Sequence, residues 1–235
     1  MMPFSATPPL VMTATIRPGR QPHLTVSDPA VRWGQYQSAI RFWLARPAVR
    51  ILVFCENSGY PVPYAPLQAE ARHAGKTLEI LRAAEPPAGT GKAYGEGELL
   101  KTALHQSDHL RQAVAFFKVT GRIQVLNFDR IAHRTRATPT ALGRRYQSQP
   151  LWADTRFFKM ERAFYLRWLI DRHQLATPNT ILGQLWGPVL TAHHLPGLWP
   201  LPHYAGQAGN GQTYDDRGWR RLARNAVALT GGYRL

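Results

Sequence analysis

Short apolar runs alternate with amphipathic stretches along this chain, and this alternation restricts the fold more than any other feature. Residues 50–55 (RILVFC) form a continuous apolar run, as expected of a strand that is buried on both faces. Similar patterns predict further strands over residues 13–17, 77–81, 115–119 and 151–158. Intervening helical patterns cover residues 28–46, 67–73 and 95–110. The order strand, helix, strand predicts an α/β fold with a mostly parallel central sheet flanked by helices.

Local signals refine several of these predictions. Asp28 and Pro29 are typical of a helix N-cap followed by the first helical position. Later in the chain we expect an exposed connection over residues 133–149, a helix over residues 160–173 and a final basic helix over residues 216–229.

Composition indicates one globular unit. Of the 235 residues, 44% are hydrophobic and 18% are charged, which excludes a disordered chain. We expect a flexible N-terminal lead-in over residues 1–12 and a single domain over residues 13–235. The lone cysteine, Cys55, lies within an apolar run and is expected to pack in the core. The sequence shows neither a membrane-spanning apolar stretch nor a secretory signal pattern, so a cytoplasmic location is expected.

The formal net charge of +15 indicates a class of partner. Lysine and arginine outnumber aspartate and glutamate by 29 to 14. Such a field attracts nucleic acid, anionic lipid head groups or phosphorylated substrates. The charge does not by itself specify an activity.

Polar residues follow the predicted strands and form a candidate binding site. These residues are Arg17 after the first strand, Asn57, Ser58 and Gly59 after the second, and Thr120, Gly121 and Arg122 after the fourth. In an open α/β sheet, ligands bind in the crevice beyond the carboxyl ends of the strands. Arg122 can act as a fork-shaped donor to a diphosphate, or it can be solvated or paired with Asp129.

A glycine-rich segment and an acidic segment complete the candidate site. Residues 91–98 (GKAYGEGE) open a helix and include Lys92, Gly95, Glu96 and Glu98. Free N–H groups at a helix N-terminus and a lysine suit an anion, although a flexible turn with two acidic residues fits the same pattern. Asp154 sits beside Arg156 in a largely apolar strand, where it is either held for reaction or paired with an arginine.

Several motifs together resemble a known group of bacterial proteins. These motifs are ENSG at 56–59, KAYGEGELLKTAL at 92–104, FFKVTGRIQVLN at 116–127, DTRFF at 154–158 and the later YAGQAGNGQTYDD. In combination they resemble GT-A-like glycosyltransferases of surface-polysaccharide (lipopolysaccharide or capsule) biosynthesis. The resemblance covers the chain from about residue 13 to its end, and it implies a single Rossmann-like domain that uses a nucleotide sugar.

The resemblance also implies where the ligand binds. The ends of the first two strands would hold the base and ribose, and Thr120-Gly121-Arg122 would stand where GT-A enzymes carry an Asp-x-Asp metal-binding motif. This sequence has no Asp-x-Asp. Either Asp129 or Asp154 therefore binds Mn²⁺ or Mg²⁺, or Arg122 and Lys92 neutralise the diphosphate directly, and we expect the second arrangement. Asp154 is the first choice for a catalytic base, followed by Glu96 and Glu98.

The expected function is glycosyl transfer from a nucleotide-sugar donor to a glycan, lipid-linked or lipopolysaccharide acceptor. The positive surface would then make peripheral contact with anionic lipid at the inner face of the inner membrane. The alternatives are a basic nucleic-acid-binding protein and a catalytically inactive nucleotide-binding relative. Acidic strand-end motifs disfavour nucleic acid, for which the net charge is the sole argument.

Overall fold

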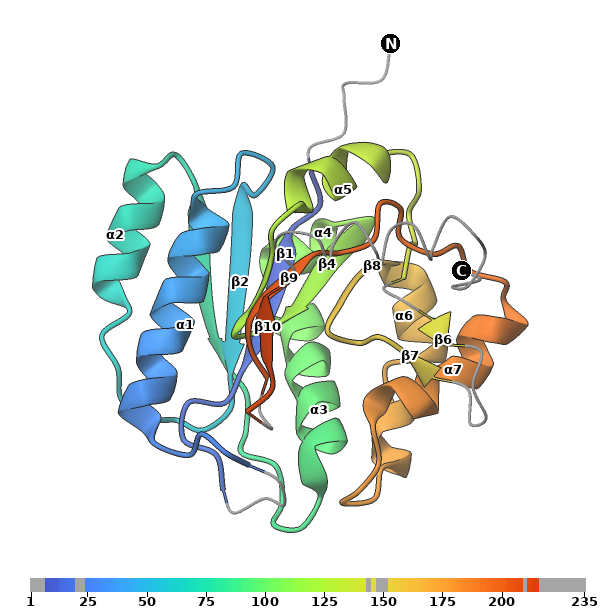
Figure 1. Ribbon diagram of the computed structural model, residues 1–235, viewed down its shortest axis with the longest axis horizontal. Helices are drawn as coiled ribbons and strands as arrows, with labels where there is room; N and C mark the ends of the chain where they lie inside the picture. Colours follow the sequence, from blue (N-terminus) through green and yellow to red (C-terminus); the bar gives the residue numbers. More distant parts are fainter. Residues whose placement is uncertain (1–6, 20–23, 143–144, 147–151, 209–210, 216–235) are drawn as a thin grey trace.

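A five-stranded sheet forms the centre of the molecule (Figure 1). The computed structural model describes residues 7–19, 24–142, 145–146, 152–208 and 211–215. The strand order is β3-β2-β1-β4-β8, with strands β1 (Leu10–Ala14), β2 (Ile51–Glu56), β3 (Thr77–Arg82), β4 (Ala115–Thr120) and β8 (Phe157–Glu161). The first four strands are parallel, and β8 runs antiparallel to β4. The predicted α/β fold with a mostly parallel sheet is therefore confirmed.

Helices cover both faces of this sheet because its strands bury alternate side chains on opposite sides. One face packs against α1 (Pro29–Leu44), α2 (Ala65–His73) and α5 (Phe128–Arg134). The other packs against α3 (Gly91–Gln106), α6 (Arg162–Trp168) and α7 (Leu182–Ala192). The neighbouring residues Phe116 and Phe117 of β4 illustrate the alternation, since Phe117 belongs to the first core and Phe116 to the second.

Two smaller sheets and two short helices complete the described structure. A three-stranded antiparallel sheet contains β5 (Ile123–Val125), β9 (Tyr204–Gln207) and β10 (Thr213–Asp215). A two-stranded sheet joins β6 (Arg145–Tyr146) to β7 (Trp152–Ala153). The short helices are α4 (Asp108–Gln112) and η1 (Arg172–Leu175).

Local sequence signals predicted the first half of the chain well. Asp28 caps α1 by accepting hydrogen bonds from the main-chain N–H groups of Ala30 and Val31, as predicted. The Cys55 thiol is buried in β2 as expected, and burial, with the neighbouring Glu56 carboxylate, raises its pKa to about 12. The first strand begins three residues earlier than predicted, because residues 10–12 are apolar and pair with β2 and β4. The expected lead-in therefore contains the start of this strand, while residues 1–6 lie outside the described residues.

Three predictions for the second half need correction. The strand expected over residues 151–158 is two strands, β7 and β8, separated by residues 154–156. Residues 157–161 pair with β4, so the helix expected from residue 160 begins at Arg162 and is followed separately by η1. The connection expected to be exposed over residues 133–149 contains part of α5 and buries Thr135 and Thr140. The basic helix expected over residues 216–229 lies outside the described residues.

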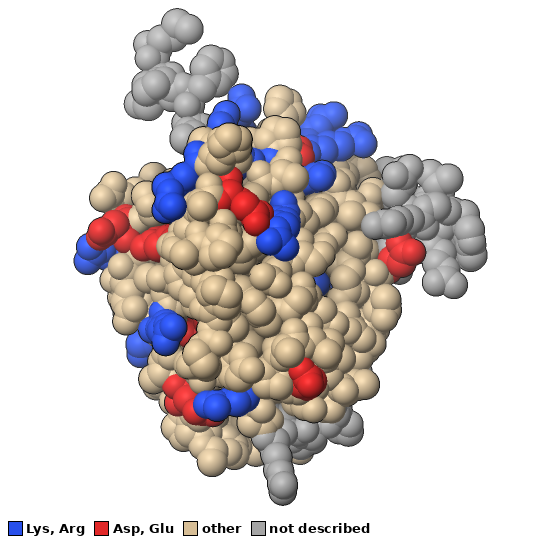
Figure 2. All heavy atoms as spheres, turned by 90° about the vertical axis from the view of Figure 1, so that its left-hand side faces the viewer, with Lys and Arg blue, Asp and Glu red and all other residues tan. Residues whose placement is uncertain are grey.

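Basic residues are concentrated at one end of the face formed by α1 and α2. Figure 2 shows Lys and Arg side chains gathered mainly toward the upper end of this face, where both helices end. Lys76 donates hydrogen bonds to the carbonyl oxygens of Leu44 and Arg46, each over 2.6 Å, and so caps the carboxyl end of α1. Burial, together with the nearby Arg50 and Arg46, lowers the pKa of Lys76. This cluster lies at the opposite end of the strands from their carboxyl termini.

Lys159 on β8 is a cation placed inside the core. Only 2% of the residue is exposed, and its Nζ donates to the carbonyl oxygen of Thr135 over 2.5 Å. Nζ also lies 5.6 Å from the centre of the Phe117 ring. Burial lowers the pKa of Lys159 to about 8. The folded protein therefore loses this proton at a lower pH than the unfolded chain does.

Replacing Lys159 with methionine tests this arrangement. Between about pH 8 and the ordinary lysine value of 10.5, the unfolded chain binds the proton and the folded chain does not, so stability rises with pH. The free energy of unfolding of the wild type, minus that of Lys159→Met, should increase by about 1–3 kcal/mol from pH 7 to pH 10. Urea denaturation of both proteins measures this difference, and a pH-independent difference would contradict the placement of Lys159.

Candidate functional site

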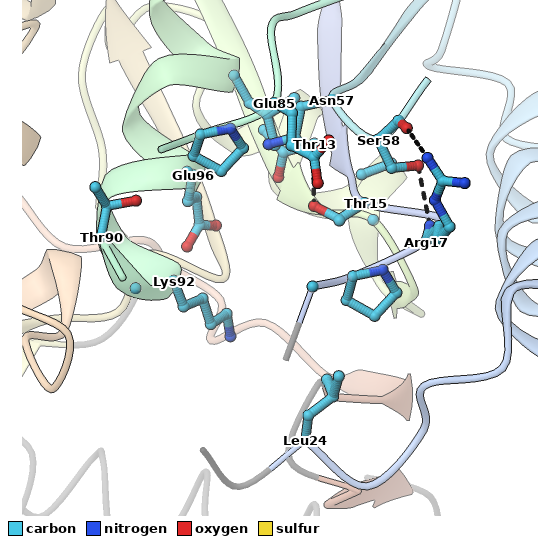
Figure 3. Close-up of a pocket in the computed structure, with 18 of the residues that line it drawn as sticks. Thr13, Thr15, Arg17, Leu24, Asn57, Ser58, Glu85, Thr90, Lys92 and Glu96 are labelled. Carbon is cyan, nitrogen blue, oxygen red and sulfur yellow. Dashed lines mark hydrogen bonds between the residues drawn. The ribbon is translucent and has the colours of Figure 1, made fainter. Parts of the chain in front are cut away.

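A cavity of about 650 Å³ lies at the carboxyl ends of β1, β2 and β4 (Figure 3). The segment that follows β3, the first turns of α3 and part of α1 contribute to its other walls. This is the edge of an open α/β sheet where ligands bind, because the loops that follow parallel strands meet there.

Most of the residues predicted for the site line this cavity. They are Arg17, Asn57, Ser58, Lys92, Gly95, Glu96, Thr120, Gly121 and Arg122. Gly59, Glu98, Asp154 and Arg156 do not line it. The structure thus brings together strand-end and helix residues that lie far apart in the sequence, including Arg122 and Lys92.

The buried carboxylate of Glu56 holds two of the cavity loops together. Its Oε1 accepts hydrogen bonds from the main-chain N–H groups of Ile16 (2.9 Å) and Ser58 (2.8 Å) and from the Ser58 hydroxyl. Its Oε2 accepts from the N–H of Gly59 over 3.0 Å. The loop after β1 and the loop after β2 are therefore held together by this one acceptor. Gly59 belongs to the second loop but does not line the cavity.

Two residues of α1 fix the first loop from the other side. The Arg32 guanidinium donates to the carbonyl oxygen of Thr15 through Nε (2.9 Å) and Nη2 (2.6 Å). The Tyr36 hydroxyl accepts from the N–H of Thr15 over 3.0 Å. Arg32 and Tyr36 both line the cavity, and the sequence analysis did not single them out.

The amide of Asn57 is held by the loop that follows β1. Its Oδ1 accepts from the Thr15 hydroxyl over 2.7 Å, so its Nδ2 is the group directed elsewhere. Nδ2 lies close to Gly95 of α3, 3.6 Å from the position that a Cβ would occupy there. Asn57 and Gly95 thus lie side by side on the cavity wall, and a Cβ at Gly95 would make only ordinary contacts there.

The amino end of α3 brings a cation and free N–H groups to the cavity. Lys92 is in the first turn of this helix, and the cap residue Thr90 makes no side-chain hydrogen bond to it. Such N–H groups and the helix dipole favour an anion. Gly91 has a φ of +78°, and a Cβ there would lie 2.6 Å from the carbonyl oxygen of Pro178. A glycine is therefore required where α3 meets this neighbouring segment.

Arg122 is anchored in the cavity wall. Its Nη1 donates to Oε1 of Gln35 over 2.5 Å, and its guanidinium carbon lies 6.0 Å from the centre of the Tyr36 ring. Burial lowers the pKa of Arg122 from its ordinary value, but an arginine stays charged at neutral pH. The partner considered from the sequence, Asp129, instead accepts from the N–H of Ala48 over 2.8 Å.

Lys118 and Glu96 form an ion pair at the cavity wall. The Lys118 side chain is fully buried on β4, and its Nζ donates to Oε1 of Glu96. The same Nζ donates to the Thr120 hydroxyl (2.8 Å) and to the carbonyl oxygen of Thr155 (2.6 Å). The sequence analysis missed Lys118. A lysine within the apolar run of β4 was the available signal, because a buried charge requires a partner.

Two of the three carboxylates predicted as catalytic form hydrogen bonds with other side chains and do not line the cavity. Glu98 lies within hydrogen-bond distance of the His173 ring, with 2.5 Å between Oε1 and Nε2. Asp154 accepts two hydrogen bonds from the Arg156 guanidinium and one from the Tyr204 hydroxyl. Asp154, the first choice for the base, is thus in the ion pair with Arg156 that was its alternative interpretation. Glu96 is the predicted acid that lines the cavity.

Neither aspartate considered for Mn²⁺ or Mg²⁺ fits a metal site. The oxygens of Asp154 are occupied by Arg156, and Asp129 faces the N–H of Ala48 and the guanidinium of Arg46. Among the described residues, no group of three or more His, Cys, Asp or Glu side chains gathers to hold a metal ion.

Comparisons with known proteins relate the chain to others through its fold. The sequence matches no protein-family model and no curated protein at a significant level. One similar solved structure is that of a protein assigned as a glucose-1-phosphate thymidylyltransferase from Bacillus anthracis, in complex with sucrose. It has a TM-score of 0.50 and 10% identity, over 97% of this chain and 96% of that one. Another is a CMP:2-keto-3-deoxy-manno-octonic acid synthetase complexed with CTP, with a TM-score of 0.46 and 10% identity, over 95% of this chain and 99% of that one.

At 10% identity, the likeness to the thymidylyltransferase structure concerns the fold alone. It covers nearly the whole length of both chains, which agrees with a single Rossmann-like α/β domain. The chain therefore has the Rossmann-like fold found in that nucleotidyltransferase structure.

Proposed function

We propose that the strand-end cavity binds the nucleoside diphosphate part of a nucleotide sugar and that the protein is a glycosyltransferase. The observation that carries this proposal is the position of Lys92 and Arg122 on the walls of one cavity, next to the amino end of α3. Two cations and a helix N-terminus suit a diphosphate. The likeness of the motifs to GT-A-like glycosyltransferases points in the same direction.

The remaining cavity residues suit the rest of such a ligand. Asn57 and the loops held by Glu56 offer hydrogen-bonding groups at the ends of β1 and β2, where we place the base and ribose. Glu96 and Thr120 offer oxygens close to the cations, where we place the sugar.

The cations of the cavity can support the transfer step. The hydroxyl oxygen of the acceptor bonds to the anomeric carbon while the bond from that carbon to the phosphate oxygen breaks, and the hydroxyl proton passes to water. The nucleoside diphosphate leaves with the electron pair, and Lys92 and Arg122 stabilise its negative charge. Burial alone would raise the pKa of Glu96, but Lys118 and Lys92 hold it below its ordinary value. Glu96 is therefore suited to accepting hydrogen bonds rather than to acting as a base.

The acceptor of the sugar and the location of the protein in the cell remain predictions. A glycan or lipid-linked acceptor and peripheral contact with an anionic membrane are consistent with the basic end of the α1 and α2 face. That end lies away from the cavity, so contact through it would turn the cavity away from the lipid. In the part of the chain that the structure describes, no helix is long and apolar enough to cross a bilayer.

Nucleotidyl transfer is a second candidate function. The observation that favours it is the fold shared with the structure assigned as a thymidylyltransferase. That reaction would join a nucleoside triphosphate to a sugar phosphate and release pyrophosphate, in the same kind of cavity. The two candidates differ in which bond breaks.

Replacing Lys92 with methionine tests the diphosphate site. At low salt and at about 100 times the dissociation constant, the best of UDP, GDP, ADP, CDP and dTDP should raise the wild-type Tm by about 5–10 °C. Lys92→Met should lose most of this rise, since it removes a phosphate contact. Differential scanning fluorimetry, with and without Mg²⁺ or Mn²⁺, measures the shift.

Lys101→Met is the matched control for that experiment. Lys101 is on the same helix, but it pairs with Asp171 over 2.7 Å and does not line the cavity. This variant should keep the full shift. The diphosphate site is contradicted if no nucleoside diphosphate stabilises the wild type, or if Lys92→Met and Lys101→Met respond alike.

Product analysis separates the two candidate reactions. Incubated with UDP-glucose, GDP-mannose, ADP-glucose or dTDP-glucose, a glycosyltransferase should slowly release the nucleoside diphosphate by transfer to water. Incubated with a nucleoside triphosphate and glucose 1-phosphate, it should release no pyrophosphate above the blank without enzyme. Chromatography and a pyrophosphate assay follow both reactions, and pyrophosphate release that depends on the sugar phosphate would favour nucleotidyl transfer instead.

A further inference from the structure

Lys118 is a buried cation whose donors are all in use. Its side chain is 0% exposed, and an ammonium group has three N–H donors. These donors face Oε1 of Glu96, the Thr120 hydroxyl and the carbonyl oxygen of Thr155. Lys118 therefore acts on a ligand through the groups that it holds and not by direct contact.

Glu96 is the group through which Lys118 can act. Its Oε1 accepts from both Lys118 and the Thr120 hydroxyl, the latter over 2.9 Å. Among the described residues, none donates to Oε2. The side chain is 11% exposed, it lines the cavity, and Figure 3 shows its carboxylate beside Lys92 at the cavity. One oxygen is thus fixed, and the other is available to a ligand.

The chemistry of this oxygen limits what it can bind. Lys118 and Lys92 lower the pKa of Glu96 against the effect of burial, so the carboxylate is ionised and can only accept hydrogen bonds. The diphosphate of a nucleotide sugar has no proton to offer at neutral pH and would be repelled, whereas a hydroxyl group donates well.

The position of Glu96 on α3 indicates which part of the ligand supplies that hydroxyl. Glu96 follows Lys92 by four residues, so both side chains lie on the same face of the helix. One helical turn, roughly 6 Å, separates them. The hydroxyl must therefore belong to the part of the ligand next to the diphosphate.

We propose that Oε2 of Glu96 accepts a hydrogen bond from a hydroxyl of the donor sugar and that Lys118, with Thr120, is the positioning residue that holds Glu96 for this contact. The inference rests on the proposed function, because it assumes that the diphosphate lies at Lys92. It assigns the substrate class as a sugar with a free hydroxyl beside the diphosphate-bearing carbon.

The test compares each nucleoside diphosphate with its nucleotide sugar. Isothermal titration of UDP and UDP-glucose, GDP and GDP-mannose, ADP and ADP-glucose, and dTDP and dTDP-glucose gives the gain in affinity due to the sugar. For the pair that binds best, Glu96→Gln should reduce this gain about tenfold or more and leave the affinity for the diphosphate within about threefold. Lys118→Met should behave in the same way.

Lys159→Met is the matched control, because Lys159 is another buried lysine, on the neighbouring strand and the opposite sheet face. It should leave both affinities unchanged.

If Lys118→Met does not fold, Thr120→Val and Thr120→Ser decide the positioning role. Valine removes the hydroxyl that holds Oε1 and should reduce the sugar gain, and serine keeps the hydroxyl and should restore it.

The outcomes separate this inference from the proposed function. If the wild type binds none of the diphosphates, the proposed function fails and the inference fails with it. If the diphosphate binds but the sugar adds no affinity, or if the gain persists in Glu96→Gln, the inference alone is overturned. If the affinity gained from the sugar is lost in Glu96→Gln but kept in both Lys118→Met and Thr120→Val, the positioning role of Lys118 and Thr120 is overturned.

Discussion

The cavity depends on the way one buried carboxylate joins two loops. Glu56 stands at the end of β2 and accepts main-chain hydrogen bonds from the loop after β1 and from its own loop. Unsatisfied N–H groups would be costly at this depth, and an ionised acceptor binds them more strongly than a neutral one. Because both loops are fixed to the same side chain, Arg17, Asn57 and Ser58 face one cavity.

A second set of charges connects the sheet to α3. Lys118 on β4 holds Glu96 on α3, while Lys92, one turn earlier, lies at the cavity and forms no ion pair with the described side chains. The positive charge of Lys118 is compensated inside the protein, and that of Lys92 is left for the ligand. This division explains how a cavity can present a cation for a diphosphate and a carboxylate for a hydroxyl side by side.

The parts of the fold and site that the sequence predicted are those with short-range signals. Short, largely apolar stretches identified β2, β3 and β4, and Asp28 marked the start of α1, because these patterns report local burial and capping. Residues 157–161 form a strand because they pair with β4, and no local sequence pattern indicates such a contact between distant segments.

The same distinction applies to the side chains of the site. Strand-end residues such as Thr120 and Arg122 were predicted because topology brings strand ends together. The pairing of Asp154 with Arg156 was one of two open interpretations, and the tertiary partner Tyr204 completes it. Lys118 was missed although its position in an apolar strand made a buried partner necessary. Arg32 and Tyr36 were missed because their contacts with Thr15 join segments that are distant in the sequence.

The most direct test of the central claim is a crystal structure of the protein with the nucleoside diphosphate that binds it best. The account predicts that the diphosphate lies at the amino end of α3, within hydrogen-bond distance of Lys92 Nζ, with the nucleoside toward the ends of β1 and β2. A diphosphate bound at another surface, with Lys92 and Arg122 not in contact with it, would contradict the account.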